Sequence, residues 1–166
     1  MVICFYFTRF PLRTFTFDTC VCTSICCKCH CSRIWICFIY FKNIENLDVV
    51  LLEVGIGGRL DATNIITPIA SVITSVGLDH IEQLGNSKEL ILNEKLGIVK
   101  NEVPLFTAVK EESLINQMIT KCKSTRSDFI KVDYESLKIK NIGLDSSEFS
   151  YKDLDNLKIK LPGVHQ

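Results

Sequence analysis

Two polar sites in this sequence follow apolar runs and are the first candidates for chemistry. Glu53 ends the run at residues 48–54, directly before a glycine-rich turn, and Asp79 and His80 follow the run at residues 69–76. The carboxyl ends of parallel strands meet at one edge of a sheet, and adjacent strands lie about 5 Å apart. Glu53 and His80 could therefore share one metal ion. The alternatives are an ordinary ion pair or cap for Glu53 and a hydrogen-bonded loop histidine.

The turn after Glu53 contains Gly55, Gly57 and Gly58, which allow a backbone to approach a phosphate group closely. They do not match G-x-G-x-x-G, and the chain contains no G-x-x-x-x-G-K-[ST] phosphate loop. Lys95 follows Glu94 on a predicted helix. From residue type alone, this pair is a solvated charge pair on the outer face of that helix.

The elements that position these residues alternate between strands and helices after residue 34. Runs rich in β-branched residues predict buried strands at 48–54, 69–76, 103–109 and 129–132. Helices are expected at 34–46, 87–100 and 111–123, and Ser87 is the expected cap of the second. The expected buried side of that second helix consists of Leu90, Ile91, Leu92, Leu96 and Val99.

Near the C-terminus, residues 149–151 and 157–161 alternate between apolar and polar, as half-exposed antiparallel strands do. The predicted fold class is α/β, a partial, mostly parallel sheet with flanking helices and a small antiparallel hairpin. The formal net charge of zero gives no indication of a nucleic acid or an anionic membrane as partner. The longest apolar run falls far short of the roughly 20 residues that span a bilayer.

The first 33 residues differ from the rest of the chain. Eight of the nine cysteines lie before residue 40, and Cys26, Cys29 and His30 are possible zinc ligands. No second pair of ligands follows them, and nothing else indicates a secreted disulfide scaffold. We interpret residues 1–33 as a disordered or out-of-frame segment and residues 34–166 as a partial domain.

Three motifs then form one pattern. LLEVGIGGRLDATNI at 51–65, ITSVGLDH at 73–80 with NEKLGIVK at 93–100, and LPGVHQ at 161–166 follow one another in order. Together they resemble the folylpolyglutamate synthases and dihydrofolate synthases of the Mur ligase superfamily, from about residue 34 onward. The resemblance implies a Mur ligase-type central ATPase domain, a cytoplasmic location, and ATP and Mg²⁺ as cofactors.

The resemblance also implies an activity and a set of site residues. Such an enzyme phosphorylates a carboxylate of folate or dihydropteroate, and the amine of L-glutamate attacks the acyl phosphate. Glu53 is implied as the Mg²⁺ ligand near ATP, His80 as the ligand of a second ion, and Lys95 as a catalytic lysine that is carbamylated to reach that ion. Asp61 is implied near the folate, with Arg59 and Asn64 in substrate or loop roles.

Two parts of the family pattern are missing. The phosphate loop that the family carries upstream of Glu53 is absent, and the sequence has no counterpart of the second domain that closes over the nucleotide. We therefore expect the chain to be inactive alone, unless a companion chain supplies these parts. The alternative hypotheses are a non-catalytic pseudogene or frameshift product and, more remotely, a cysteine-rich zinc-binding module.

Overall fold

The computed structural model describes residues 2–7, 14–17, 49–143 and 146–159. It divides into two compact units, Met1–Lys131 and Val132–Gln166. The helix expected at 34–46, the candidate zinc ligands and the motif at 161–166 lie outside the described residues. None of the helices in the described segments is long and apolar enough to cross a bilayer.

The described strands of the first unit form one sheet in the order β2-β3-β1-β4-β5-β6. Its strands are β1 (Val2–Phe7), β2 (Thr14–Phe17), β3 (Val49–Glu53), β4 (Ala70–Ile73), β5 (Leu105–Thr107) and β6 (Phe129–Lys131). The pairs β2–β3, β4–β5 and β5–β6 are parallel, whereas β1 is antiparallel to both β3 and β4. The prediction of a mostly parallel sheet is confirmed.

Helical segments connect the strands after β3. They are η1 (Ala62–Ile65), α2 (Ile81–Leu84), α3 (Lys88–Lys95), η2 (Leu96–Ile98) and α4 (Glu112–Thr125). The Ser87 side chain accepts a hydrogen bond from the Leu90 amide, so the predicted helix cap is confirmed. From β3 onward, the predicted order of strand, strand, helix, strand, helix and strand is also confirmed. η1 and α2 are additional short segments that hydrophobic periodicity did not predict.

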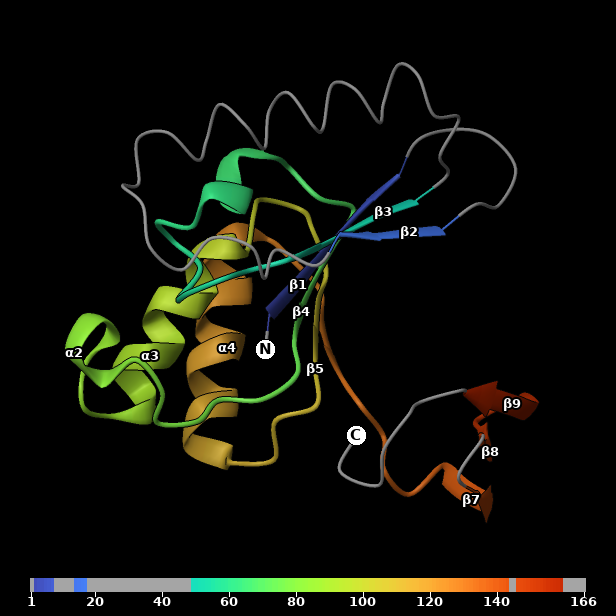
Figure 1. Ribbon diagram of the computed structural model, residues 1–166. Coiled ribbons are helices and arrows are strands. Elements are labelled where there is room, and N and C mark those ends of the chain that lie inside the picture. The colour runs from blue at the N-terminus through green and yellow to red at the C-terminus, as the bar shows by residue number, and fades with distance from the viewer. Residues whose placement is uncertain (1, 8–13, 18–48, 144–145, 160–166) are drawn as a thin grey trace. The chain divides into compact units, whose positions relative to one another are not determined.

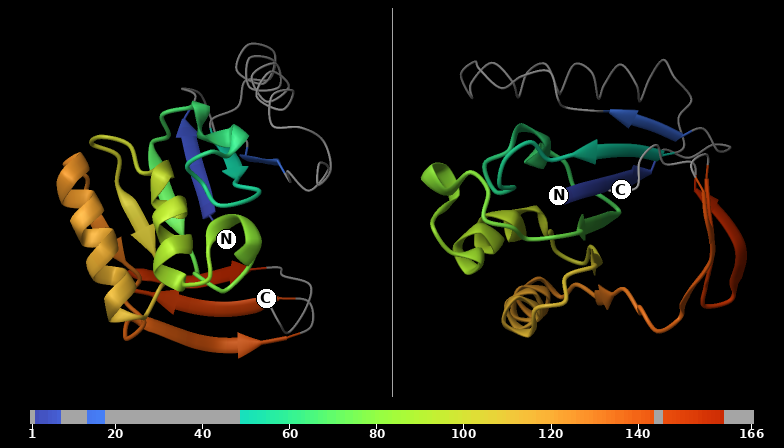
Figure 2. Two further views of the ribbon diagram at one scale, coloured as in Figure 1. Left: turned by 90° about the vertical axis from the view of Figure 1, so that its left-hand side faces the viewer. Right: turned by 60° about the horizontal axis from the view of Figure 1, so that its bottom comes forward.

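α3 and α4 lie side by side on one side of β4 and β5 (Figures 1 and 2), and the core lies between helices and sheet. Leu92 of α3, Met118 of α4 and Leu105 of β5 are all fully buried there. On β5 the neighbouring Phe106 has 37% of its surface exposed, because successive strand residues point to opposite faces. The expected buried side of the helix predicted at 87–100 is confirmed except at Leu90, which is half exposed and packs near Gly85.

The second unit is an antiparallel sheet of β7 (Leu137–Ile142), β8 (Ser147–Tyr151) and β9 (Leu154–Ile159). The predicted hairpin is present as β8 and β9, and β7 adds a third strand on the other side of β8. The register places Ile139 opposite Phe149, and Phe149 opposite Leu157. One face of this sheet is therefore apolar, as alternation in half-buried strands requires.

Candidate functional site

Glu53 is the last residue of β3 and is partly buried. β1 runs antiparallel between β3 and β4, so β3 and β4 share one direction and their carboxyl ends lie at the same sheet edge. The expectation that β3 and β4 are immediate neighbours is wrong, because β1 lies between them. Strands two positions apart are separated by roughly 10 Å. Any contact between Glu53 and His80 therefore depends on the loop after β4.

That loop carries Asp79 and His80, both exposed, and leads into α2. The His80 amide donates to Asp79 Oδ1 at 2.8 Å, and its Nε2 lies 3.7 Å from Asp79 Oδ2. The backbone of His80 is left-handed, with φ of 52°, a conformation that non-glycine residues adopt uncommonly. Asp79 therefore restrains the backbone of His80, and its carboxylate lies near the ring.

Lys95 is the last residue of α3 and is partly buried. Burial lowers the pKa of Lys95 from its ordinary value because it penalises the charged ammonium, and the nearby Asp79 carboxylate partly opposes this shift. Asp79 thus contacts His80 and also acts electrostatically on Lys95. The lowered pKa increases the share of neutral amine, the form that reacts with carbon dioxide to give a carbamate.

Because the folded-state pKa of Lys95 is lowered, the stability of the protein is expected to change with pH in the alkaline range. Between this lowered pKa and the ordinary lysine value, the unfolded chain holds a proton that the folded chain has lost. The free energy of unfolding should therefore rise with pH across this window. Urea unfolding at several pH values measures this rise in the free energy of unfolding. Lys95→Met is expected to make the rise smaller. Lys88→Met should keep it, and equal slopes in Lys95→Met and the unsubstituted chain would contradict the prediction.

Asp61 organises the glycine turn. Its Oδ2 accepts hydrogen bonds from the amides of Gly55 and Ile56, at 3.1 and 3.3 Å. Its Oδ1 accepts from the amide of Thr63 at 2.8 Å and from the Thr63 hydroxyl, and caps η1. Both carboxylate oxygens of Asp61 are therefore engaged within the loop, and a role near folate stays a prediction.

Arg59 and Asn64 bind the turn to the end of α3. The guanidinium of Arg59 contacts both carboxylate oxygens of Glu94, with Nε at 3.2 Å from each and Nη2 at 3.0 Å from Oε1. Asn64 Nδ2 donates to the carbonyl oxygens of Arg59 and Gly97, at 3.0 and 3.1 Å. These side chains contact protein groups, and their roles toward substrate stay predictions.

Two of the predicted phosphate-binding glycines are buried against helices. A Cβ on Gly58 would lie 2.9 Å from the carbonyl oxygens of both Glu94 and Lys95. Gly57 has a φ of 68°, and a Cβ there would lie 3.0 Å from Leu84. Both glycines are thus needed for close packing and turn geometry, which accounts for them without a ligand. Binding of a phosphate at Gly55, Gly57 and Gly58 stays a prediction.

The side chains predicted to bind metal are a carboxylate, an imidazole and an amine, on Glu53, His80 and Lys95. Within the described part of the chain, no group of three or more His, Cys, Asp or Glu residues is arranged to hold a metal ion. Lys95 bears an amine, which is not a ligand for a hard cation in its charged form. The carboxylate of Glu53 is nevertheless a donor that fits Mg²⁺, which is usually bound by one or two carboxylates together with water and substrate phosphates.

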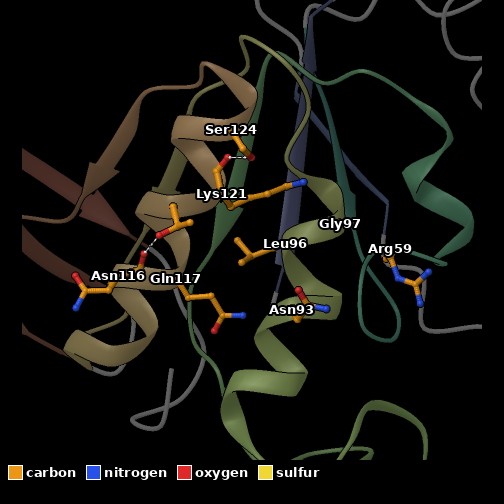
Figure 3. A pocket seen from close by; sticks show the side chains of 9 residues that line it. Arg59, Asn93, Leu96, Gly97, Asn116, Gln117, Lys121 and Ser124 are labelled. Atoms are coloured by element: carbon orange, nitrogen blue, oxygen red, sulfur yellow. Dashed lines mark hydrogen bonds between the residues drawn. The ribbon is translucent and has the colours of Figure 1, made fainter.

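A groove of about 560 Å³ lies beside this region, between the α3–η2 segment and α4. Figure 3 shows Lys121 and Gln117 of α4 facing Asn93, Leu96 and Gly97 across it. Arg59 also lines the groove, but Glu53, His80 and Lys95 do not. The groove is consequently separate from the predicted metal-binding residues.

Asp79 and Glu94 are the residues of this region to which motif reasoning assigned no role. Asp79 was noted only as a neighbour of His80, and Glu94 only as a surface partner of Lys95. The sequence did contain a signal for Glu94, since an acid on a helix and an arginine in a tight turn are natural ion-pair partners. The separation of the two segments along the chain concealed their contact.

The fold is an α/β domain. Its candidate residues Glu53 and His80 follow β3 and β4, two strands that run in the same direction. The family model of the Mur ligase middle domain matches residues 38–166. The chain belongs to this family.

Curated relatives and solved structures agree with this assignment. The dihydrofolate synthase/folylpolyglutamate synthase of Bacillus subtilis is 34% identical over 134 residues, covering 78% of this chain and 31% of that protein. The folylpolyglutamate synthase of Lacticaseibacillus casei is 35% identical over 133 residues, covering 76% and 31%. The structure of folylpolyglutamate synthase from Thermotoga maritima aligns with a TM-score of 0.65 at 32% identity, covering 81% and 31%. The chain thus spans about a third of the length of these relatives.

Proposed function

We propose that this chain forms the central part of a cytoplasmic ATP-dependent ligase that joins L-glutamate to folate or dihydropteroate through an acyl phosphate. The observation that carries the proposal is the packing of two family motifs into one region. The turn at residues 55–58 lies against the end of α3, where the Arg59 amide donates to the Glu94 carbonyl at 2.8 Å. This packing joins the segment that bears Glu53 to the helix that bears Lys95.

The names of related structures support the substrates and the nucleotide. An FPGS complex with AMPPCP and folate aligns with this chain at a TM-score of 0.66 and 32% identity, covering 76% of this chain and 32% of that one. AMPPCP is an ATP analogue, so ATP is the proposed nucleotide here. The activity is proposed for the assembled protein, whether the remaining parts belong to one longer chain or to a companion chain.

The proposed roles follow the chemistry of each side chain. Glu53 supplies a carboxylate for Mg²⁺, and His80 and a carbamylated Lys95 supply the donors for a second ion. Carbamylation converts the amine into a carboxylate, which provides the oxygen donors that Mg²⁺ prefers. When bound, Mg²⁺ supplies neutralisation of the negative charge on a transferring phosphoryl group. Asp61 keeps the turn after Glu53 in one conformation through the Gly55 and Ile56 amides.

The proposal is tested in a chimera in which the aligned segment of this chain replaces its counterpart in the Bacillus subtilis relative. Release of ADP is measured with ATP, Mg²⁺, glutamate and either a reduced folate or dihydropteroate. We expect ADP release that requires both the folate and glutamate. Glu53→Ala in the chimera should reduce this rate by at least about 100-fold, because a charge-stabilising group is lost.

Glu82→Ala is the matched control, since Glu82 is an exposed acid on α2. A folded chimera without folate-dependent ADP release, or with equal losses in the two variants, would overturn the proposed function. The chain alone is assayed in parallel, and we expect no folate-dependent turnover from it.

A further inference from the structure

We propose that Arg59 and Glu94 are a positioning pair, which fixes the glycine turn on α3 and so sets the placement of Lys95 relative to Glu53. The inference rests on the proposed function, in which Glu53 and Lys95 are the acting residues. The proposed function gives neither member of the pair a part in the phosphoryl transfer.

The geometry of the pair restrains both partners. Arg59 Nε lies 3.2 Å from each carboxylate oxygen of Glu94, and Nη2 lies 3.0 Å from Oε1. The Arg59 amide also donates to the Glu94 carbonyl at 2.8 Å. Side chain and backbone of one residue thus hold side chain and backbone of the other. A guanidinium in such contact specifies orientation as well as charge.

The surroundings leave little freedom for another arrangement. A Cβ on Gly58 would lie 2.9 Å from the Lys95 carbonyl oxygen, and one on Gly97 would lie 2.4 Å from the Arg59 Cα. Asn64 closes the same contact by donating to the Arg59 and Gly97 carbonyls. The turn and the helix therefore meet backbone to backbone, and Figure 3 shows Arg59 on the segment facing Gly97.

The exposure of the pair argues that its role is orientation more than stability. The Arg59 side chain is 55% exposed and that of Glu94 is 21% exposed. Ion pairs that reach solvent contribute little to stability. Their geometric effect remains, because a shift of α3 along the turn would separate Glu94 from Arg59 and carry the adjoining Lys95 with it.

The test measures how fast each lysine of the intact chain is acetylated under trace labelling, read by mass spectrometry of peptides. Arg59→Gln and Glu94→Gln are each expected to change the rate at Lys95 by about threefold or more relative to Lys121, through local opening. The exchanged pair, Arg59→Glu with Glu94→Arg, should return the rate toward that of the unsubstituted chain.

Lys88→Gln is the matched control, because Lys88 forms a different ion pair of α3, with Glu111. It should leave the Lys95 rate unchanged. A Lys95 rate that stays constant in the Arg59 and Glu94 variants, or that changes equally in Lys88→Gln, would overturn the inference. If Arg59→Gln does not fold by circular dichroism, Arg59→Lys is used, which keeps the charge and loses the two-point contact.

Labelling does not require ligase chemistry, so the two proposals fail separately. An inactive chimera with a Lys95 rate that responds to the pair would refute the proposed function and leave the positioning role supported. An active chimera, together with a Lys95 rate that does not change when the pair is altered, would support the proposed function and refute the positioning role.

Discussion

Replacing Gly97 with alanine is expected to lower the free energy of unfolding by about 3 kcal/mol or more, as in severe overpacking. A Cβ at this position would lie 2.4 Å from both Cα and Cβ of Arg59. The Arg59 Cα is a backbone atom, so relief requires the glycine turn to move away from η2. Alanine is the better helix former by about 1 kcal/mol, so a loss of stability here would come from the clash.

Urea unfolding followed by circular dichroism measures this effect, and Gly77→Ala is the matched control. A Cβ on Gly77 would meet no atom within 4 Å, so the same substitution there should be neutral or slightly stabilising. If Gly97→Ala unfolds at the same urea concentration as Gly77→Ala, the close packing of turn and helix described above is incorrect.

The second large effect is expected in the core between α3 and the sheet. Leu92→Ala should cost about 2–5 kcal/mol of unfolding free energy, because a fully buried side chain is replaced by a cavity. Leu92 belongs to the same buried cluster as Leu105 and Met118. The loss therefore affects contacts from three elements.

Leu90→Ala provides the control for this prediction within the same helix. Leu90 is 50% exposed, so the identical truncation should cost less than about 1 kcal/mol. Thermal unfolding of the two variants at one protein concentration decides the matter. Similar melting temperatures would mean that Leu92 does not face the core.

The sequence was sufficient for those parts of the fold in which hydrophobic periodicity is strong. The strand ending at Glu53 was predicted close to its observed bounds, and the helix capped by Ser87 was predicted to residue 100 but ends at Lys95, followed by η2 to Ile98. Periodicity could not show that β1 (Val2–Phe7) separates β3 from β4, because strand order depends on contacts distant in sequence. The β7 strand was missed although residues 137–142 alternate, since interspersed lysines reduce the apolar signal. The interpretation of residues 1–33 as out-of-frame sequence stays a prediction.

The candidate site was predictable as a set of motifs but not as a set of contacts. Glu53 ends β3 as predicted, whereas His80 lies beyond the loop after β4, at the start of α2. The partners of Arg59 could not be derived from spacing, because its carboxylate lies on a separate helix. The activity of the chimera and of its Glu53→Ala variant tests the predicted role of Glu53.

The parallel pairing of β4, β5 and β6 has a consequence for the rate of folding. Each of these pairings bridges a complete helical crossover, whereas only a few residues separate β7, β8 and β9 along the chain. Closing a long segment costs more entropy than closing a turn, so the antiparallel unit should form earlier. Lys95 and the glycine turn come together only after the segment between the turn and α3 has folded. The region that contains the candidate site is therefore expected to form with the first unit, after the antiparallel unit.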